Sequence, residues 1–255
     1  MLDISTEVAI VADSQRNTAA KRLASQFNLP LASKDKKPRF TLWLGPERLE
    51  LHDRQKTAGP VYVEFTAGRA LHRRRFGGGK NQPLARAIGI KDNPTVIDAT
   101  AGLGRDSFVF ATLGCKVIML ERSPILAALL ADGLMRAELH APTATIADRI
   151  TLIHDDARDY LKKINDQDKP ATIYLDPMYP HRKKSALVKK EMRIARELVS
   201  DDDDATELLK IAIDKTQNRV TVKRPIHAEL LIATPKPDTQ IRRKKTRYDI
   251  YFRKA

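Results

Sequence analysis

Cysteine is almost absent from this chain of 255 residues, and Cys115 is its single copy. One thiol excludes an intramolecular disulfide and any metal site built from several cysteines. Cys115 begins an apolar stretch, which is typical of a cysteine that packs in a core rather than one that reacts. Six histidines are present, but no pair has the close spacing of zinc ligands. The sequence therefore predicts no metal site.

Long apolar runs are absent as well. No run approaches the ~20 residues that cross a membrane. The N-terminus lacks the basic-then-apolar pattern of a secretion signal. We therefore expect a cytoplasmic protein that does not enter a membrane.

Acidic residues are outnumbered, since 46 Lys and Arg face 32 Asp and Glu and give a formal net charge of +14. Such an excess suggests a polyanionic partner, most simply nucleic acid, although a merely soluble basic protein shows it too. Clustering into separate basic runs, among them Arg242–Lys245, favours nucleic acid. The candidate phosphate contacts, with solvated surface charge as the alternative, are Arg73, Arg74, Arg75, Lys80, Arg182, Lys183 and Lys184.

An acidic residue, Asp176, follows the apolar stretch Ala171–Leu175, which is typical of a buried strand. Its carboxylate and the rigidly held carbonyl of Pro177 can both accept hydrogen bonds from a planar exocyclic amine. The ring of Tyr179 can stack on the base that carries this amine. These three residues are candidate catalytic residues. The alternative is a strand that ends in an ordinary Asp-Pro turn.

A glycine-rich turn lies upstream. Pro94–Asp98 is predicted as a short strand, Ala99–Gly104 as a turn of small residues, and Arg105 as the start of a helix. A second strand is predicted over Cys115–Leu120 and ends at Glu121. Such a unit binds a nucleoside, because glycines let the ligand approach the backbone and the acid accepts hydrogen bonds from ribose hydroxyls.

The turn differs from a dinucleotide site. Gly102 and Gly104 are present, but the third glycine of Gly-x-Gly-x-x-Gly is missing. Asp106 near the helix start would repel a phosphate, and Asp98 suits a cationic partner. S-adenosylmethionine carries an ammonium group, a ribose and an adenine but no phosphate. The pattern therefore favours this cofactor over a nicotinamide dinucleotide.

Two segments resemble known motifs. Asp98–Asp106 resembles the first motif of class I methyltransferases, and Asp176–Tyr179 resembles their amino-methylating fourth motif, Asn/Asp-Pro-Pro-Tyr/Phe, with Met178 in place of the second proline. The closer similarity is to the RsmJ-type 16S ribosomal RNA guanine-N2 methyltransferases, from about Leu44 to the end. The segments that carry it are Ala70–Lys80, Asp98–Asp106, Leu175–Arg193 and Tyr248–Tyr251.

The resemblance implies an α/β, Rossmann-like fold with a seven-stranded, mostly parallel sheet. It implies methyl transfer from S-adenosylmethionine to the exocyclic N2 amine of a guanine in small-subunit ribosomal RNA. Amino methylation of DNA or of a protein side-chain amide, and non-catalytic RNA binding, are the alternatives. With Asp98 and Gly102 of the turn, the candidate cofactor residues are Arg105, Asp106, Glu121, Arg122, Asp156, Ala157 and Asp176.

Residues 1–80 are predicted as a small α+β region that ends in a basic, glycine-rich joint, and residues 81–255 as the methyltransferase domain. The first region should hold a helix over Asn17–Phe27, a hairpin over Phe40–Leu51 and a strand over Val61–Phe65.

Further strands are predicted over Arg149–His154 and Arg219–Lys223, a helix over Ser185–Leu198 and a closing hairpin near Tyr248–Phe252. In a doubly wound sheet the carboxyl ends of parallel strands share one edge. The acids expected on that edge are Asp98, Glu121, Asp156 and Asp176.

Overall fold

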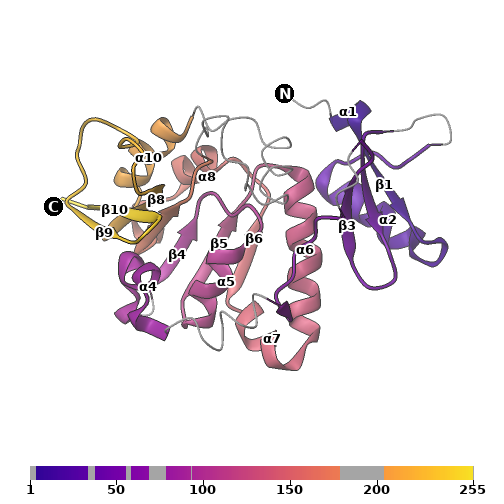
Figure 1. The fold of residues 1–255 in the computed structure, drawn as a ribbon, viewed down its shortest axis with the longest axis horizontal. Helices are drawn as coiled ribbons and strands as arrows, with labels where there is room; N and C mark the ends of the chain where they lie inside the picture. The colour runs from indigo at the N-terminus through magenta and orange to yellow at the C-terminus, as the bar shows by residue number, and fades with distance from the viewer. Residues whose placement is uncertain are drawn as a thin grey trace.

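Two β-sheets organise the protein, as the computed structural model shows (Figure 1). The structure describes residues 4–33, 38–55, 59–68, 79–92, 94–178 and 204–254. A three-stranded sheet has the order β1-β2-β3, and a seven-stranded sheet has the order β6-β5-β4-β7-β8-β10-β9. In Figure 1 the small sheet lies beside α6 at one end of the large sheet.

The small sheet belongs to the N-terminal region. Its strands are β1 (Val8–Ala12), β2 (Phe40–Leu44) and β3 (Leu49–Asp53), with β1 parallel and β3 antiparallel to β2. Alternate residues of β2 are buried because successive side chains point to opposite faces of a strand. The other elements of this part are α1 (Ile4–Glu7), η1 (Ser14–Arg16) and α2 (Asn17–Phe27). The predicted helix and hairpin are confirmed.

The large sheet is mostly parallel. Its strands are β4 (Thr95–Asp98), β5 (Lys116–Leu120), β6 (Ile150–Ile153), β7 (Thr172–Leu175), β8 (Arg219–Pro225), β9 (Thr239–Arg242) and β10 (Thr246–Phe252). The first five of these pair in parallel, and β10 is antiparallel to both of its neighbours. This arrangement confirms the predicted Rossmann-like α/β fold and the closing hairpin.

Helices cover both faces of the large sheet. They are α4 (Pro83–Ile88), α5 (Arg105–Thr112), α6 (Pro124–Leu139), α7 (Ala141–Ala147), α8 (Ala157–Lys163) and α10 (Ala205–Asp214), with short η2 (Gly79–Asn81), η3 (Ile90–Asp92) and η4 (Asp166–Asp168). On β4, Val96 packs in the cluster with α4 to α7 and Ile97 in the cluster with α8 and α10. Among the described residues, no helix is both long and apolar enough to cross a membrane.

The N-terminal region shares its hydrophobic core with the large sheet. One cluster runs from Val8 and Phe40 of the small sheet to Leu130 of α6 and Met119 of β5. Buried apolar surface of this kind is the main favourable term in folding. The two parts are therefore joined by a continuous core rather than by a linker alone.

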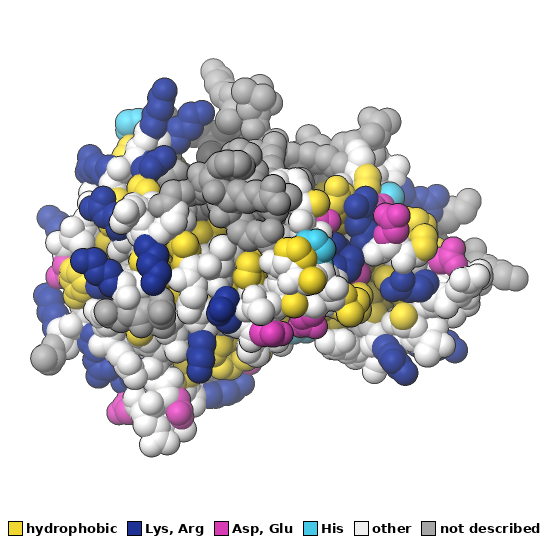
Figure 2. All heavy atoms as spheres, turned by 90° about the horizontal axis from the view of Figure 1, so that it is seen from below, with side chains coloured by type: hydrophobic (Ala, Val, Ile, Leu, Met, Phe, Trp, Pro, Cys, Tyr) yellow, Lys and Arg dark blue, Asp and Glu magenta, His cyan; other side chains and the backbone are white. Residues whose placement is uncertain are grey.

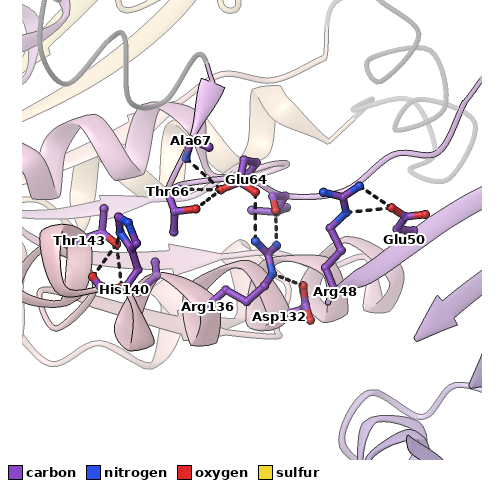
Figure 3. A network of polar contacts seen from close by, with 11 residues as sticks. Arg48, Glu50, Glu64, Thr66, Ala67, Asp132, Arg136, His140 and Thr143 are labelled. Carbon is purple, nitrogen blue, oxygen red and sulfur yellow. Dashed lines mark hydrogen bonds and ion pairs between the residues drawn. The ribbon is translucent and has the colours of Figure 1, made fainter. Parts of the chain in front are cut away.

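The predicted strand over Val61–Phe65 is wrong. Val61 forms an isolated bridge with Leu51, but the following residues do not pair as a strand. Figure 3 shows the reason: the guanidinium of Arg136 on α6 donates to the carbonyl of Val63 and also binds Glu64 and Asp132. A backbone group that a strand would give to a neighbour is thus satisfied by a side chain.

Val63 packs against Gly133 of α6, where a Cβ would collide with Cγ1 and Cβ of Val63. Replacing glycine by alanine within a helix ordinarily stabilises it by about 1 kcal/mol. We predict the opposite sign for Gly133→Ala, a loss of about 1–3 kcal/mol in the free energy of unfolding, because the stiff Val63 side chain has to move. Denaturant titration measures the change. Val63→Ala in the same protein should recover part of the loss, and a stabilising Gly133→Ala would contradict this packing.

Candidate active site

The carboxyl ends of the parallel strands surround a cavity of about 370 Å³. This volume lies within the range of small-molecule sites. All of the predicted cofactor residues line it, namely Asp98, Gly102, Arg105, Asp106, Glu121, Arg122, Asp156, Ala157 and Asp176. Pro177 lines it too, whereas Tyr179 lies outside the described residues. The four acids predicted on one edge of the sheet therefore meet at one cavity.

The glycine turn is fastened at both ends by carboxylates. Asp98, at the end of β4, accepts hydrogen bonds from the Ser107 hydroxyl and from the Thr100 backbone N–H at 3.2 Å. Glu121, just after β5, accepts from the backbone N–H of Gly102 and of Ser123, both at 2.8 Å. Gly102 has φ of +57°, which other residues adopt at a cost. The turn is therefore preformed.

Gly104 ends the turn and lies on the N-terminal region. Its φ is +69°, and a Cβ here would collide with Leu130 and Phe65. Phe65 in turn stacks on Phe108 of α5 with ring centroids 4.4 Å apart. Close packing leaves no space for a side chain at Gly104. The segment that follows the small sheet thus supports the turn from behind.

Asp176 is held by two groups that sequence reasoning missed. Its backbone N–H donates to the Thr100 hydroxyl at 2.6 Å, which ties the end of β7 to the glycine turn. Its carboxylate lies 2.5 Å from the ammonium of Lys223 in β8. The same ammonium lies 2.8 Å from the carboxylate of Asp106, which also accepts from the Tyr174 hydroxyl at 2.7 Å. Burial raises the pKa of Tyr174 well above its ordinary value, and the nearby carboxylates raise it further.

A second charged cluster borders the cavity near α8 and α10. Asp156 caps α8 by accepting from the backbone N–H of Arg158 at 2.9 Å, and the Arg158 guanidinium lowers the pKa of this acid. Asp204 pairs with Arg158 at 3.1 Å and with Arg122 at 2.6 Å. Asp204, which directly precedes α10, thus joins Arg122, 82 residues earlier in the chain, to the Asp156–Arg158 pair on one side of the cavity.

Lys80 is the one predicted phosphate contact among the described residues. It lies in η2, is exposed and does not line the cavity. The other predicted phosphate contacts and the helix predicted over 185–198 lie outside the described residues; the contacts are Arg73, Arg74, Arg75, Arg182, Lys183 and Lys184. Lys223 had a signal in the sequence, because it ends a predicted strand in the same way as the four acids do.

Comparison with known proteins gives one answer. The family described as "Putative SAM-dependent methyltransferase" matches residues 22–253. A ribosomal RNA small subunit methyltransferase J from Nitrosococcus oceani is 50% identical, covering 92% of this chain and 93% of its own. The same-named protein of Thioalkalivibrio sulfidiphilus is 48% identical, covering 98% and 99%. The chain belongs to this methyltransferase family.

A solved structure agrees. The crystal structure of a SAM-dependent methyltransferase from Neisseria gonorrhoeae has a TM-score of 0.78 and 36% sequence identity and covers 96% of each chain. The protein is therefore an S-adenosylmethionine-dependent methyltransferase. The lining of its cavity suits a cationic, phosphate-free cofactor, since seven carboxylates face four cationic side chains. Among the described residues, no group of His, Cys, Asp and Glu side chains is arranged to hold a metal.

Burial raises the pKa of Asp98 to about 7; hydrogen bonds from Ser107 and Thr100 oppose this rise, and the charges of Asp106 and Asp176 add to it. The unfolded chain loses this proton near pH 4, so between pH 4 and 7 the folded state binds more protons. The free energy of unfolding should therefore fall as pH rises through this range, by at most about 4 kcal/mol from this group.

Asp98→Asn removes the titration, so its unfolding free energy should fall less steeply over the same range. Denaturant titrations of both proteins at about pH 4.5 and at about pH 7 measure the two unfolding free energies and so check this expectation. Parallel pH profiles would show that Asp98 is ionised throughout in the folded protein.

Proposed function

We propose that this methyltransferase transfers a methyl group from S-adenosylmethionine to the N2 amine of a guanine in 16S ribosomal RNA. The proposal is carried by one observation: the preformed glycine turn and Asp176 face the same cavity. The relatives, whose names state that they are small-subunit ribosomal RNA methyltransferases, cover nearly the whole chain. A ribosomal RNA substrate also implies that the reaction takes place in the cytoplasm.

The turn side of the cavity would hold the cofactor. Asp98 and Asp106 offer carboxylates to the ammonium of the methionine part, and Glu121 offers its remaining lone pairs to the ribose hydroxyls. Asp156 and Ala157, at the start of α8, border the place left for the adenine. When bound, S-adenosylmethionine supplies a methyl group on a positively charged sulfur, which is already an activated electrophile.

The Asp176 side would hold the target amine. The Asp176 carboxylate and the Pro177 carbonyl accept hydrogen bonds from the amine and so orient its lone pair toward the cofactor. The hydrogen bond from the Asp176 backbone to Thr100 fixes this acid relative to the turn. No strong base is needed, because the amine can release its extra proton after the carbon–nitrogen bond has formed. Tyr179 would stack on the base, which is worth about 1–3 kcal/mol.

RNA needs a positively charged path to the cavity. Figure 2, which views the molecule from below, shows Lys and Arg side chains over the end that carries β9, β10 and α4, on the side of α7 rather than at the carboxyl ends of the strands. The end of β9 and the turn to β10 present four exposed cations, Arg242–Lys245, and none of them forms an ion pair with a carboxylate in the described part of the chain. The carbonyl of Lys245 accepts from the backbone N–H of Ile226, next to Pro225 in the cavity wall.

This turn would contact phosphates together with the basic residues outside the described ranges, Arg73, Arg74, Arg75, Arg182, Lys183 and Lys184. Lys80 lies near Cys115, at the amino-terminal end of β5, so it would contact RNA only away from the cavity. The position of the β9–β10 turn supports this role, because the turn lies at the carboxyl edge of the sheet, where the target base would enter. Phosphate contacts position the RNA without reading its sequence.

The proposal is tested with methyl-labelled S-adenosylmethionine and three acceptors from cells that lack the protein: small-subunit ribosomal RNA, DNA and protein. We expect label in the RNA alone, and N2-methylguanosine after digestion to nucleosides and mass spectrometry. Label only in DNA or protein, or a different methylated nucleoside, would refute the proposed substrate. Fragmentation of the labelled RNA then locates the modified guanine.

Asp176→Ala should lower the rate of RNA methylation by roughly 10²-fold or more, because the amine loses its acceptor in the transition state. Asp176→Asn keeps one acceptor oxygen and should retain more activity than the alanine variant. Single-turnover rates measure both, and thermal melting monitors the fold. A folded Asp176→Ala protein with the wild-type rate would remove Asp176 from the mechanism.

Lys244→Glu with Lys245→Glu should raise KM for RNA by roughly 3–10-fold and leave kcat near its wild-type value, since phosphate contacts act in binding. The dependence of log KM on log salt should become shallower by about 1–2 units of slope. Lys91→Glu with Lys116→Glu is the matched control, because it changes the net charge by the same amount and both lysines are exposed near the amino-terminal ends of β4 and β5. An equal rise of KM in the control would show that RNA binding depends on the net charge of the protein and not on this turn.

A further inference from the structure

Lys223 lines the part of the cavity next to Asp176. It lies in β8, directly after Val222, which pairs with Leu175 of β7, so Lys223 lies beside Asp176 at the carboxyl end of β7. Its ammonium is 2.5 Å from Asp176 and 2.8 Å from Asp106, and its side chain is 28% exposed and lines the cavity. A cation and a carboxylate are thus presented side by side.

Lys223 is held in its charged form. Burial disfavours the ammonium of Lys223, but Asp176 and Asp106 outweigh burial and hold the pKa of Lys223 above its ordinary value. The ammonium therefore remains a donor at every pH at which the protein works. An ammonium has three N–H donors, and no acceptor among the residues that the structure describes takes the third.

The Lys223 ammonium, a donor, lies next to the Asp176 carboxylate, an acceptor, and this order complements the Watson–Crick edge of guanine. Along its Watson–Crick edge guanine presents the O6 acceptor, then the N1–H donor, then the N2 amine. Adenine presents the opposite order, a donor amine at position 6 and an acceptor at N1, and cytosine likewise presents an amine beside an acceptor. Uracil has an acceptor beside a donor but carries no amine to methylate.

We propose that Lys223 is a specificity-determining residue that donates to O6 of the target guanine while Asp176 accepts from its N1–H and N2 amine. This inference rests on the proposed function and names the base edge that the same site reads. An adenine in this place would bring its donor amine against the donor ammonium of Lys223 and its acceptor N1 against the acceptor carboxylate of Asp176. Buried polar groups left without partners are what makes such sites selective.

A purely structural role gives a different expectation. If Lys223 only neutralises Asp106 and Asp176, its removal should lower activity by the same factor for any base that carries the N2 amine. If it reads O6, the loss should depend on the atom at position 6. Changing the residue and the base together separates the two roles.

The test uses a short RNA around the mapped guanine, with either guanine or 6-thioguanine at that position. The sulfur analogue keeps N1–H and the N2 amine but replaces O6 with a poor acceptor. Wild-type protein should lose roughly tenfold or more in kcat/KM on the analogue, as expected for a hydrogen bond from a charged donor. Lys223→Met should have a low kcat/KM on guanine, and replacing guanine by 6-thioguanine should not lower this value further.

Equal fold-losses for Lys223→Met on the two bases, with the wild-type preference for oxygen intact, would overturn the proposal. If Lys223→Met methylates neither base, Lys223→Arg decides, because a guanidinium still donates and should keep the preference for oxygen; its loss would also overturn the proposal. Calorimetry with S-adenosylhomocysteine monitors the integrity of the cofactor side. Absence of any guanine methylation by the wild-type protein would instead refute the proposed function.

Discussion

The positive charge of Lys223 allows several carboxylates to converge at the edge of the large sheet. Asp98, Asp106 and Asp176 lie close enough that the latter two raise the pKa of Asp98. Like charges at this separation disfavour ionisation unless a cation lies between them. Lys223 pairs with both Asp106 and Asp176, while burial raises the pKa of Asp98 to about 7 and Asp98 accepts hydrogen bonds from the glycine turn. Acceptors for a cationic cofactor and for an amine can therefore coexist in one cavity.

The N-terminal region is part of this site rather than an appendage. Phe65 fills the space behind Gly104, and Val63 fills the space beside Gly133, so two glycines of the large domain are matched to one N-terminal segment. Arg136 binds the same segment through Val63 and Glu64 (Figure 3). A substitution in this segment therefore affects the packing behind the glycine turn that would hold the cofactor. From there the chain continues toward the basic run Arg73–Arg75, which is outside the described residues.

Much of the fold was predictable because local patterns and long-range structure agree. The apolar runs that end at Asp98, Glu121 and Asp176 are parallel neighbours, and the rule that ligands gather at carboxyl ends placed their acids together. Val61–Phe65 was mispredicted because its alternating pattern is the same whether its backbone pairs with a strand or with Arg136. Thr100 was missed because its partner lies 76 residues away, a relation that no local pattern shows. Lys223 ended a predicted strand, but its pairing with Asp176, 47 residues away, was not visible in the sequence. The roles of the cofactor residues, of Tyr179 and of the basic runs stay predictions.

The most direct test of the central claim is a crystal structure of the protein with S-adenosylhomocysteine. If donor and acceptor meet at the carboxyl edge, the ribose should bind at Glu121, the amino group should face Asp98 and Asp106, and the sulfur should point toward Asp176. The same product bound outside this cavity, or with its sulfur directed away from Asp176, would contradict the claim.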